Sequence, residues 1–284
     1  MKIVVIGSKG QLGSDLVKVF SIDEVVGLTH EEIEVESIDS CKVIKKITPD
    51  IVINTAAFHK TDACEDNPNR TFLVNAIGAK NVAEICSEID SVAVYISTDY
   101  IFDGIKGIPY NENDTPNPIN TYGISKLAGE FYTKLAKKHY IIRMSSLFGI
   151  AGASGKGGNF VETMINKAKN DEELKVVDDI FMSPTYTKEA AIMLKNIIVN
   201  KLPFGVYHVT NIGYCSWYEF AKTIFEFLNL NIDLKPIKVR SLNTKAKRPS
   251  FSALESIKLS KDALSLSNWK DALKNYLNEK GHLN

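Results

Sequence analysis

The chain contains few cysteines, and they are not closely paired in the sequence. The four cysteines are Cys41, Cys64, Cys86 and Cys215, and their spacing matches neither a zinc-binding motif nor a disulfide framework. The five histidines are scattered as well and show no metal-ligand spacing. We therefore expect reduced thiols, as in a cytoplasmic protein, and no metal-binding residues.

The sequence also lacks net charge and long apolar runs. Basic and acidic residues both number 34, so the formal net charge is zero, and no global field attracts nucleic acid or a membrane. No stretch approaches the ~20 apolar residues that span a bilayer, and the N-terminal apolar run is too short for a signal peptide. These absences favour a cytoplasmic protein that binds neither nucleic acid nor membrane.

The most informative segment that is present is a glycine-rich turn near the N-terminus. Residues 2–6 form an apolar, β-branched run that is typical of a buried parallel strand. Gly7, Gly10 and Gly13 follow this run, and residues 11–20 have helical periodicity. Such a turn brings backbone N–H groups close to a diphosphate at a helix N-terminus. The alternative is a plain turn between a strand and a helix.

A second motif places a tyrosine and a lysine on one face of a helix. Tyr122 and Lys126 are four residues apart in a predicted helix over 121–137. A free phenol has a pKa near ~10, and a neighbouring ammonium together with an oxidised nicotinamide ring would lower it by ~1–3 units. Tyr122 could then protonate an alkoxide as hydride reaches a ketone carbon. The alternative is a solvent-exposed pair.

A third motif follows the apolar run 92–96. Ser97, Thr98 and Asp99 come directly after this run, at the carboxyl edge of a predicted strand, where open parallel sheets bind ligands. A hydroxyl group there could donate to a substrate carbonyl and hold it beside Tyr122. The alternative is a hydroxyl-containing turn that simply ends the strand.

Strand and helix signals alternate along the first half of the chain. Strands are predicted at 2–7, 24–28, 50–55, 92–97, 139–144, 173–177 and 205–209. Helices are predicted at 11–20, 39–48, 70–89, 121–137, 160–170, 187–200, 216–228 and 268–279. The alternation predicts an α/β fold, a Rossmann-type doubly wound parallel sheet with a small, interleaved C-terminal substrate domain.

We expect two domains. Residues 1–148 would form the NAD(P)-binding Rossmann domain, completed by segments near 187–212. Residues 149–284 would form mainly the smaller substrate-binding domain. The cleft between the two domains is then the expected substrate site.

The three motifs, in this order, resemble the extended short-chain dehydrogenase/reductase family and, within it, the dTDP-4-dehydrorhamnose reductases. The matching stretches are 10–13, 54–57, 62–65, 74–76, 97–104, 122–130, 158–160, 183–185 and 247–249. The resemblance implies an oxidoreductase that uses NAD(P)H to reduce the C4 ketone of a nucleotide-linked 4-dehydro-6-deoxysugar. The favoured reaction converts dTDP-4-dehydro-L-rhamnose to dTDP-L-rhamnose, in dTDP-rhamnose biosynthesis.

The resemblance also implies a role for individual residues. The catalytic residues would be Thr98, Tyr122 and Lys126. The cofactor-binding residues would be Gly7, Gly10, Gln11, Leu12, Gly13, His30, Glu34, Val35, Ala56, Ala57, Phe58, Ser97, Tyr122 and Lys126. The substrate-binding residues would be His59, Thr98, Asp99, Ser146, Asn159 and Arg248. Ser146 stands where family members usually carry a tryptophan that packs against the sugar, so we expect a different sugar pocket.

The choice of cofactor and the alternative functions stay open at this point. The predicted strand 24–28 ends without a carboxylate at its tip, although Glu31 follows closely, and His30 could meet a 2′-phosphate. NADP(H) is therefore favoured, with NAD(H) as the alternative. The alternative functions are a sugar-nucleotide epimerase of the same fold and a non-catalytic subunit resembling the β subunit of methionine adenosyltransferase. The expected partner is a sugar-nucleotide substrate, and a homodimer is left open.

Overall fold

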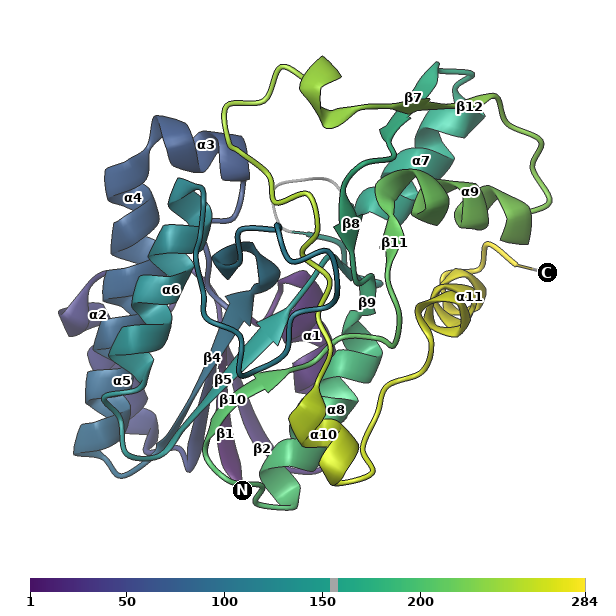
Figure 1. The fold of residues 1–284 in the computed structure, drawn as a ribbon. Helices are drawn as coiled ribbons and strands as arrows, with labels where there is room; N and C mark the ends of the chain where they lie inside the picture. Colours follow the sequence, from purple (N-terminus) through teal and green to yellow (C-terminus); the bar gives the residue numbers. More distant parts are fainter. Residues whose placement is uncertain (154–157, 284) are drawn as a thin grey trace.

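The centre of the molecule is one parallel sheet. The structure, a computed structural model, describes residues 1–153 and 158–283, so residues 154–157 and 284 of the expected second domain lie outside it. Six strands lie in the order β10-β5-β4-β3-β1-β2 (Figure 1). Their bounds are β1 (Lys2–Ile6), β2 (Glu24–Leu28), β3 (Ile51–Asn54), β4 (Val92–Thr98), β5 (His139–Met144) and β10 (Gly205–His208). Every neighbouring pair is parallel.

Helices cover both faces of this sheet because its strands are apolar on both sides. In β1, Ile3 and Val5 join a core with helices α1 (Gln11–Val19) and α8 (Thr187–Val199). The alternate residues, Val4 and Ile6, join a second core on the opposite face. The helices on that face include α2 (Ile38–Ile47), α5 (Gly78–Glu88) and α6 (Thr121–Thr133). The doubly wound α/β fold that we predicted is thus confirmed.

The long helix predicted over 70–89 is interrupted. It begins as α4 (Pro68–Phe72), passes through a π-helical turn (Leu73–Ile77) and continues as α5. Pro68 occupies the first turn of α4, where its missing N–H costs nothing. A short helix that we had not predicted, α3 (Thr61–Asp66), precedes it.

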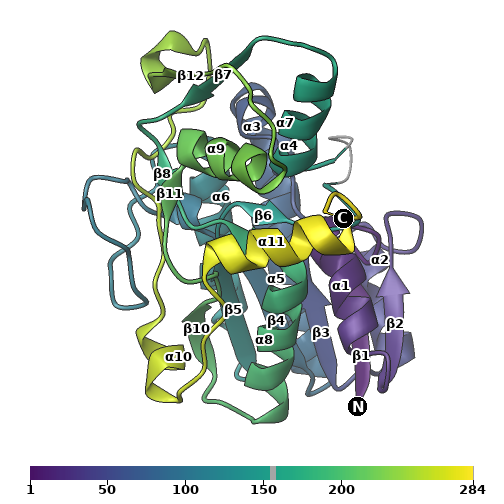
Figure 2. The same cartoon turned by 90° about the vertical axis from the view of Figure 1, so that its right-hand side faces the viewer.

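A second lobe lies beyond the carboxyl edge of the sheet. It contains the helices and strands α7 (Phe160–Lys169), β7 (Leu174–Val177), α9 (Trp217–Phe227), β12 (Leu234–Ile237) and α11 (Trp269–Glu279). The short strands are β6 (Leu147–Phe148), β8 (Phe181–Met182), β9 (Thr185–Tyr186) and β11 (Cys215–Ser216). An aromatic core that includes Phe148, Tyr186, Phe220 and Tyr276 holds this lobe together. Helix α11 lies across the lobe, above α1 and α8 (Figure 2).

One segment connects this lobe back to the sheet. We call residues 242–254 the strap; it runs from the second lobe to α10 (Ile257–Lys261). On the way it contacts the loop 102–120: Ser250 Oγ donates to the Gly104 carbonyl at 2.9 Å, and Leu254 forms a parallel bridge with Tyr110. The strap is thereby fixed to the sheet domain along its length.

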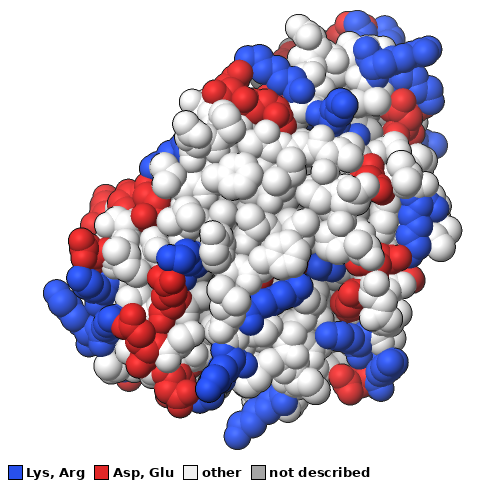
Figure 3. Space-filling view, turned by 60° about the vertical axis from the view of Figure 1, so that its left-hand side comes forward, with Lys and Arg blue, Asp and Glu red and all other residues white. Residues whose placement is uncertain are grey.

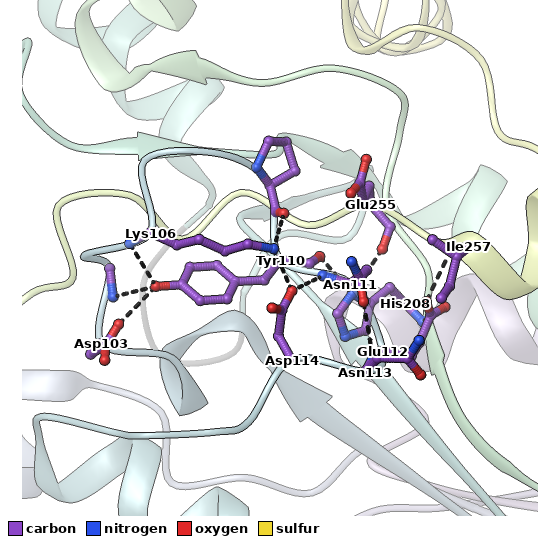
Figure 4. A network of polar contacts seen from close by, with 12 residues as sticks. Asp103, Lys106, Tyr110, Asn111, Glu112, Asn113, Asp114, His208, Glu255 and Ile257 are labelled. Carbon is purple, nitrogen blue, oxygen red and sulfur yellow. Dashed lines mark hydrogen bonds and ion pairs between the residues drawn. The ribbon is translucent and has the colours of Figure 1, made fainter.

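A polar network anchors the lower end of that contact (Figure 4). The Tyr110 hydroxyl donates to Asp103 at 2.7 Å. Glu112 accepts from the backbone N–H groups of His208 at 3.1 Å and Ile257 at 3.0 Å. The loop, the end of β10 and the start of α10 are therefore joined by hydrogen bonds.

Among the residues described here, no helix combines the length and the apolar character that crossing a bilayer would require.

Candidate active site

A cavity of about 750 Å³ lies between the carboxyl edge of the sheet and the second lobe. All three sequence motifs contribute to its wall, although they are far apart in the chain. Residues Gly10, Thr98 and Tyr122 line it from the sheet domain, and Asn159 and Arg248 line it from the other side. The structure thus brings the predicted catalytic and substrate residues to one place.

The glycine turn forms a tight cradle at one end of this cavity. Gly7 has a φ of +79°, which L side chains rarely adopt. A Cβ atom at Gly13 would lie 2.1 Å from the Gly7 carbonyl oxygen, so the turn and the helix have room only for hydrogen there. No side chain in the described structure caps α1 at Gly10. These features fit the diphosphate of a dinucleotide, because the residues at the start of α1 line the cavity and the first N–H groups of a helix have no partner within it.

The predicted cofactor residues divide into two groups. Those that line the cavity are Gly7, Gly10, Gln11, Leu12, Gly13, His30, Ala56, Ala57, Ser97, Tyr122 and Lys126. Glu34, Val35 and Phe58 do not line it. Val35 is a buried core residue whose side chain packs beside Gly78, and Glu34 lies near His30, 3.6 Å from its Nδ1 atom.

Phe58 is held in place by a residue that sequence analysis did not single out. Asn75, fully buried in the π-helical turn, accepts from the Phe58 N–H at 2.8 Å and donates to the Phe58 carbonyl at 3.0 Å. The same amide donates to Ser125 Oγ on α6 at 2.9 Å. Asn75 therefore joins the segment after β3 to the helix that carries Tyr122. Its only signal in the sequence was its place in the matching stretch 74–76.

Lys126 is almost fully buried, at 2 % exposure. Its Nζ atom donates to the Ile96 carbonyl at 2.6 Å and lies 4.0 Å from the centre of the Tyr95 ring. Burial lowers the pKa of Lys126 to about 7, while the nearby Glu130 carboxylate acts in the opposite direction.

The protein surroundings of Tyr122 act against the expected lowering of its pKa. Burial raises the pKa of Tyr122 above its ordinary value, and a hydrogen bond with Thr98 opposes that rise only in part. Lys126 does not offset this rise, because its Nζ atom faces a carbonyl and an aromatic ring. Burial also lowers the pKa of Lys126, so its charged form is disfavoured. Tyr122 therefore keeps its proton, which is the form that a proton donor needs.

The residues around Thr98 are engaged with one another. Ser97 donates to Glu130 at 2.6 Å, and Asp99 accepts from Thr98 at 3.0 Å, from Ser145 at 2.9 Å and from Ser252. Burial raises the pKa of Asp99 to about 6, although these hydroxyl donors favour its charged form. Asp99 thus orients the Thr98 hydroxyl by accepting its hydrogen bond, a role that the sequence did not indicate.

The remaining predicted substrate residues converge on the cavity from separate segments. His59 and Ser146 both line it, and Ser146 has a φ of +46°. Asn159 is the N-cap of α7: its Oδ1 accepts from Glu162 N–H at 3.1 Å, and its Nδ2 donates to Gly149 O and Tyr276 Oη, both at 3.0 Å. The amide of Asn159 is therefore already engaged within the protein.

Aromatic side chains line the cavity, although Ser146 is not one of them. Phe160 and Trp217 both line the cavity. Their ring centres are 4.6 Å apart.

Within residues 1–153 and 158–283, no group of three or more His, Cys, Asp or Glu side chains is arranged to hold a metal ion.

Comparison with known proteins gives a consistent result. The model of the family described as RmlD substrate binding domain matches residues 1–281. The spore coat polysaccharide biosynthesis protein SpsK of Bacillus subtilis is 37% identical over 283 residues, which cover 98% of each chain. The dTDP-4-dehydrorhamnose reductase of Aggregatibacter actinomycetemcomitans is 34% identical over 291 residues, covering 96% of this chain and 97% of the relative.

A solved structure agrees with these relatives. The dTDP-4-dehydrorhamnose reductase from Bacillus anthracis, crystallised in complex with NADP, superposes with a TM-score of 0.92 at 35% identity, covering 98% of this chain and 99% of that one. The resemblance inferred from the motifs is confirmed. The chain belongs to the RmlD substrate binding domain family.

Proposed function

We propose that this protein is an NADPH-dependent reductase that converts dTDP-4-dehydro-L-rhamnose to dTDP-L-rhamnose. The observation that carries the proposal is the single cavity that joins the glycine cradle to Thr98, Tyr122 and Lys126. Relatives that carry the name of this activity match along nearly the whole chain. NADP(H) is the favoured cofactor, with NAD(H) as the alternative, since the Bacillus anthracis relative was crystallised with NADP.

In this proposal the two parts of the chain hold different ligands. Residues 1–148, completed by segments near 187–212, hold the cofactor, and residues 149–284 mainly hold the sugar nucleotide. When bound, the nicotinamide supplies the hydride. The glycine turn would bind the cofactor diphosphate, and Lys126 would contact the cofactor ribose.

The protein's own contribution to the reaction is a proton held at the Tyr122 hydroxyl. Its raised pKa keeps the phenol protonated at neutral pH, so it can donate to the oxygen that develops negative charge at C4. Thr98 hydrogen-bonds with Tyr122 and donates its hydroxyl hydrogen to Asp99 in this structure. It would hold the same oxygen once that hydrogen turns from Asp99 to the substrate.

The direct test is stoichiometric oxidation of NADPH with dTDP-4-dehydro-L-rhamnose as substrate. Tyr122→Phe is expected to abolish turnover and leave NADPH affinity, measured by fluorescence titration, within about twofold. Tyr132→Phe, on the same helix but outside the cavity wall, is the matched control and should keep full activity. Unchanged turnover in Tyr122→Phe would refute the assignment.

The same assay separates the two alternatives. An epimerase of this fold returns the hydride and consumes no NADPH overall, so it would give product without a fall in absorbance at the NADPH band. A non-catalytic subunit would bind NADPH and give no product from any keto sugar.

We also propose a homodimer formed through α6. Ile124 and Phe131 are exposed at one face of α6, and Leu135 continues this face just after the helix, with exposures of 45%, 59% and 78%. Figure 3, with the α6 side of Figure 1 brought forward, shows uncharged side chains over the middle of this face and charged side chains mainly around it. Phe131→Asp should give a monomer in analytical ultracentrifugation, whereas Ile22→Asp, at the unrelated and 87% exposed Ile22, should not.

A cytoplasmic location completes the proposal. The thiols of Cys41 and Cys86 are buried, and burial raises the pKa of each to about 12, so both are unreactive, as expected of a protein from a reducing compartment.

A further inference from the structure

Helix α3 places carboxylates against the strap. Asp62 Oδ1 accepts from the Ala246 N–H at 3.1 Å, and its Oδ2 lies 3.7 Å from Arg248 Nη2. Asp66, one turn further along, pairs with Lys245. The strap segment 245–248 is thus held at its backbone and at two of its cationic side chains by one short helix.

Arg248 is only partly satisfied by these contacts. Its side chain is 28% exposed and lines the cavity. Its Nε atom is buried and has no hydrogen-bond partner among the described residues. A guanidinium group offers five N–H donors in a planar fork that suits phosphate. The fork therefore has donors left for an anion in the cavity while its Nη2 end faces Asp62.

The other end of α3 is joined to the catalytic helix. Glu65 accepts from the Thr121 N–H at 2.8 Å and from its hydroxyl at 2.7 Å, and Thr121 directly precedes Tyr122. The strap contacts the same point, because Asn120 Nδ2 donates to the Lys247 carbonyl at 2.9 Å. Helix α3 therefore connects the strap to α6, which carries Tyr122, and α3 and α6 lie side by side in Figure 1.

We propose that Asp62 is a positioning residue that aims Arg248 at the diphosphate of the sugar nucleotide. Asp62 contacts Ala246 through its backbone N–H and Arg248 through its guanidinium group. It thereby directs the remaining N–H donors of that guanidinium group into the cavity. The inference rests on the proposed function, since it assigns the diphosphate of that same substrate to Arg248. An exposed ion pair contributes little to stability, so the effect belongs to binding and not to folding.

Positioning and simple electrostatics predict opposite results when Asp62 loses its charge. Asp62→Asn keeps the size and the acceptor for Ala246 N–H but removes a negative charge near the bound anion. Electrostatics alone would then lower the KM for the sugar nucleotide. If Asp62 aims Arg248, the KM instead rises about tenfold, the scale of one charge-assisted hydrogen bond, while kcat and the KM for NADPH stay within about twofold.

Asp66→Asn is the matched control. It removes the same charge from the same helix and frees the same strap at Lys245, but it leaves the pair with Arg248 intact. Its KM should stay the same or fall slightly. Equal increases in KM for both variants would show that loosening of the strap is the cause, and the proposal would then be wrong.

Binding of dTDP, measured by calorimetry with thymidine as the comparison, separates the inference from the proposed function. Asp62→Asn should weaken dTDP about tenfold and leave thymidine unchanged. The effect should vanish in an Arg248→Met background, and Arg248→Lys, which lacks the fork, should weaken dTDP with Asp62 intact. Persistence of the Asp62→Asn effect in Arg248→Met overturns the inference. If wild-type protein bound no dTDP and reduced no keto sugar, the proposed function itself would fail.

Discussion

At the scale of single residues, burial governs the protonation of the catalytic pair. Tyr122 and Lys126 lie in surroundings poor in water, where the charged form of each is disfavoured. The pair is therefore a neutral phenol next to an amine that titrates near neutral pH. This state differs from the phenolate and ammonium pair that the motif indicates in a sequence.

Lys126 should make stability depend on pH. Its pKa falls from 10.5 to about 7 on folding, so the unfolded chain binds more protons between these values and stability rises with pH across them. The stabilisation is complete above about pH 10.5 and is lost as pH falls through 7. Urea midpoints of cofactor-free protein between pH 6 and 10 should show this slope in wild type and not in Lys126→Met. Lys134→Met, at an exposed position after α6, should keep the slope.

Titration of His208 should make stability depend on pH in the acid range as well. Burial lowers the pKa of His208 from 6.5 to about 4, although the negative charge of Glu112 acts to raise it. The unfolded chain again binds more protons, so stability present above pH 6.5 is lost as pH falls towards 4. His208→Asn retains a donor for the carbonyls of Tyr110 and Glu255 and should lose less stability than wild type over this interval. A parallel loss in both proteins, measured by urea unfolding, would contradict the role assigned to His208.

The sequence located the reactive residues but not their hydrogen-bond partners. Tyr122, Lys126 and Thr98 were identified because each belongs to a motif with fixed spacing and strand-edge placement. Asp99 and Asn159 were expected to face the substrate, yet their polar atoms are bonded within the protein. Those partners come from segments up to 153 residues away in the chain, and no local pattern encodes such a pairing.

At the scale of elements, the periodic segments were predictable and the irregular ones were not. The strands of the sheet and the long helices followed from apolar runs and helical spacing, because each buries one or two faces. The π-helical turn and α3 lie between such segments. Their form depends on tertiary contacts, such as those of Asn75 with Phe58 and of Glu65 with Thr121, which periodicity does not show.

Loss of the Asn75 side chain amide from the π-helical turn should destabilise the protein. Asn75→Ala leaves the Phe58 backbone groups and the Ser125 hydroxyl without this partner, at a cost of about 1–3 kcal/mol in the free energy of unfolding. Because Ser125 precedes Lys126 on α6, kcat should fall as well. Leu73→Ala, at the 44% exposed side chain in the same turn, is the control and should change the free energy of unfolding by less than about 0.5 kcal/mol.

At the scale of the whole molecule, cofactor binding should stabilise both lobes together. A ligand that binds only the folded state at 100 times its Kd adds about 2.7 kcal/mol. NADPH should therefore raise Tm by several degrees, and more than NADH at equal concentration if the preference for NADP(H) is correct. Gly13→Ala, whose new Cβ would meet the Gly7 carbonyl, should show no shift with either. A larger shift with NADH would reverse the cofactor preference.

The interleaving of the chain has a consequence for its synthesis on the ribosome. Helix α1 is made first, but its buried face is completed by α8, where Thr187 donates to Asp15 at 2.6 Å. The edge strand β10 is also made late and pairs with β5. A nascent chain that has just emerged to residue 148 therefore leaves exposed the part of this sheet face that α8 covers in the folded protein. Some sixty more residues must be made before that part is covered, an interval in which chaperones would have their best access.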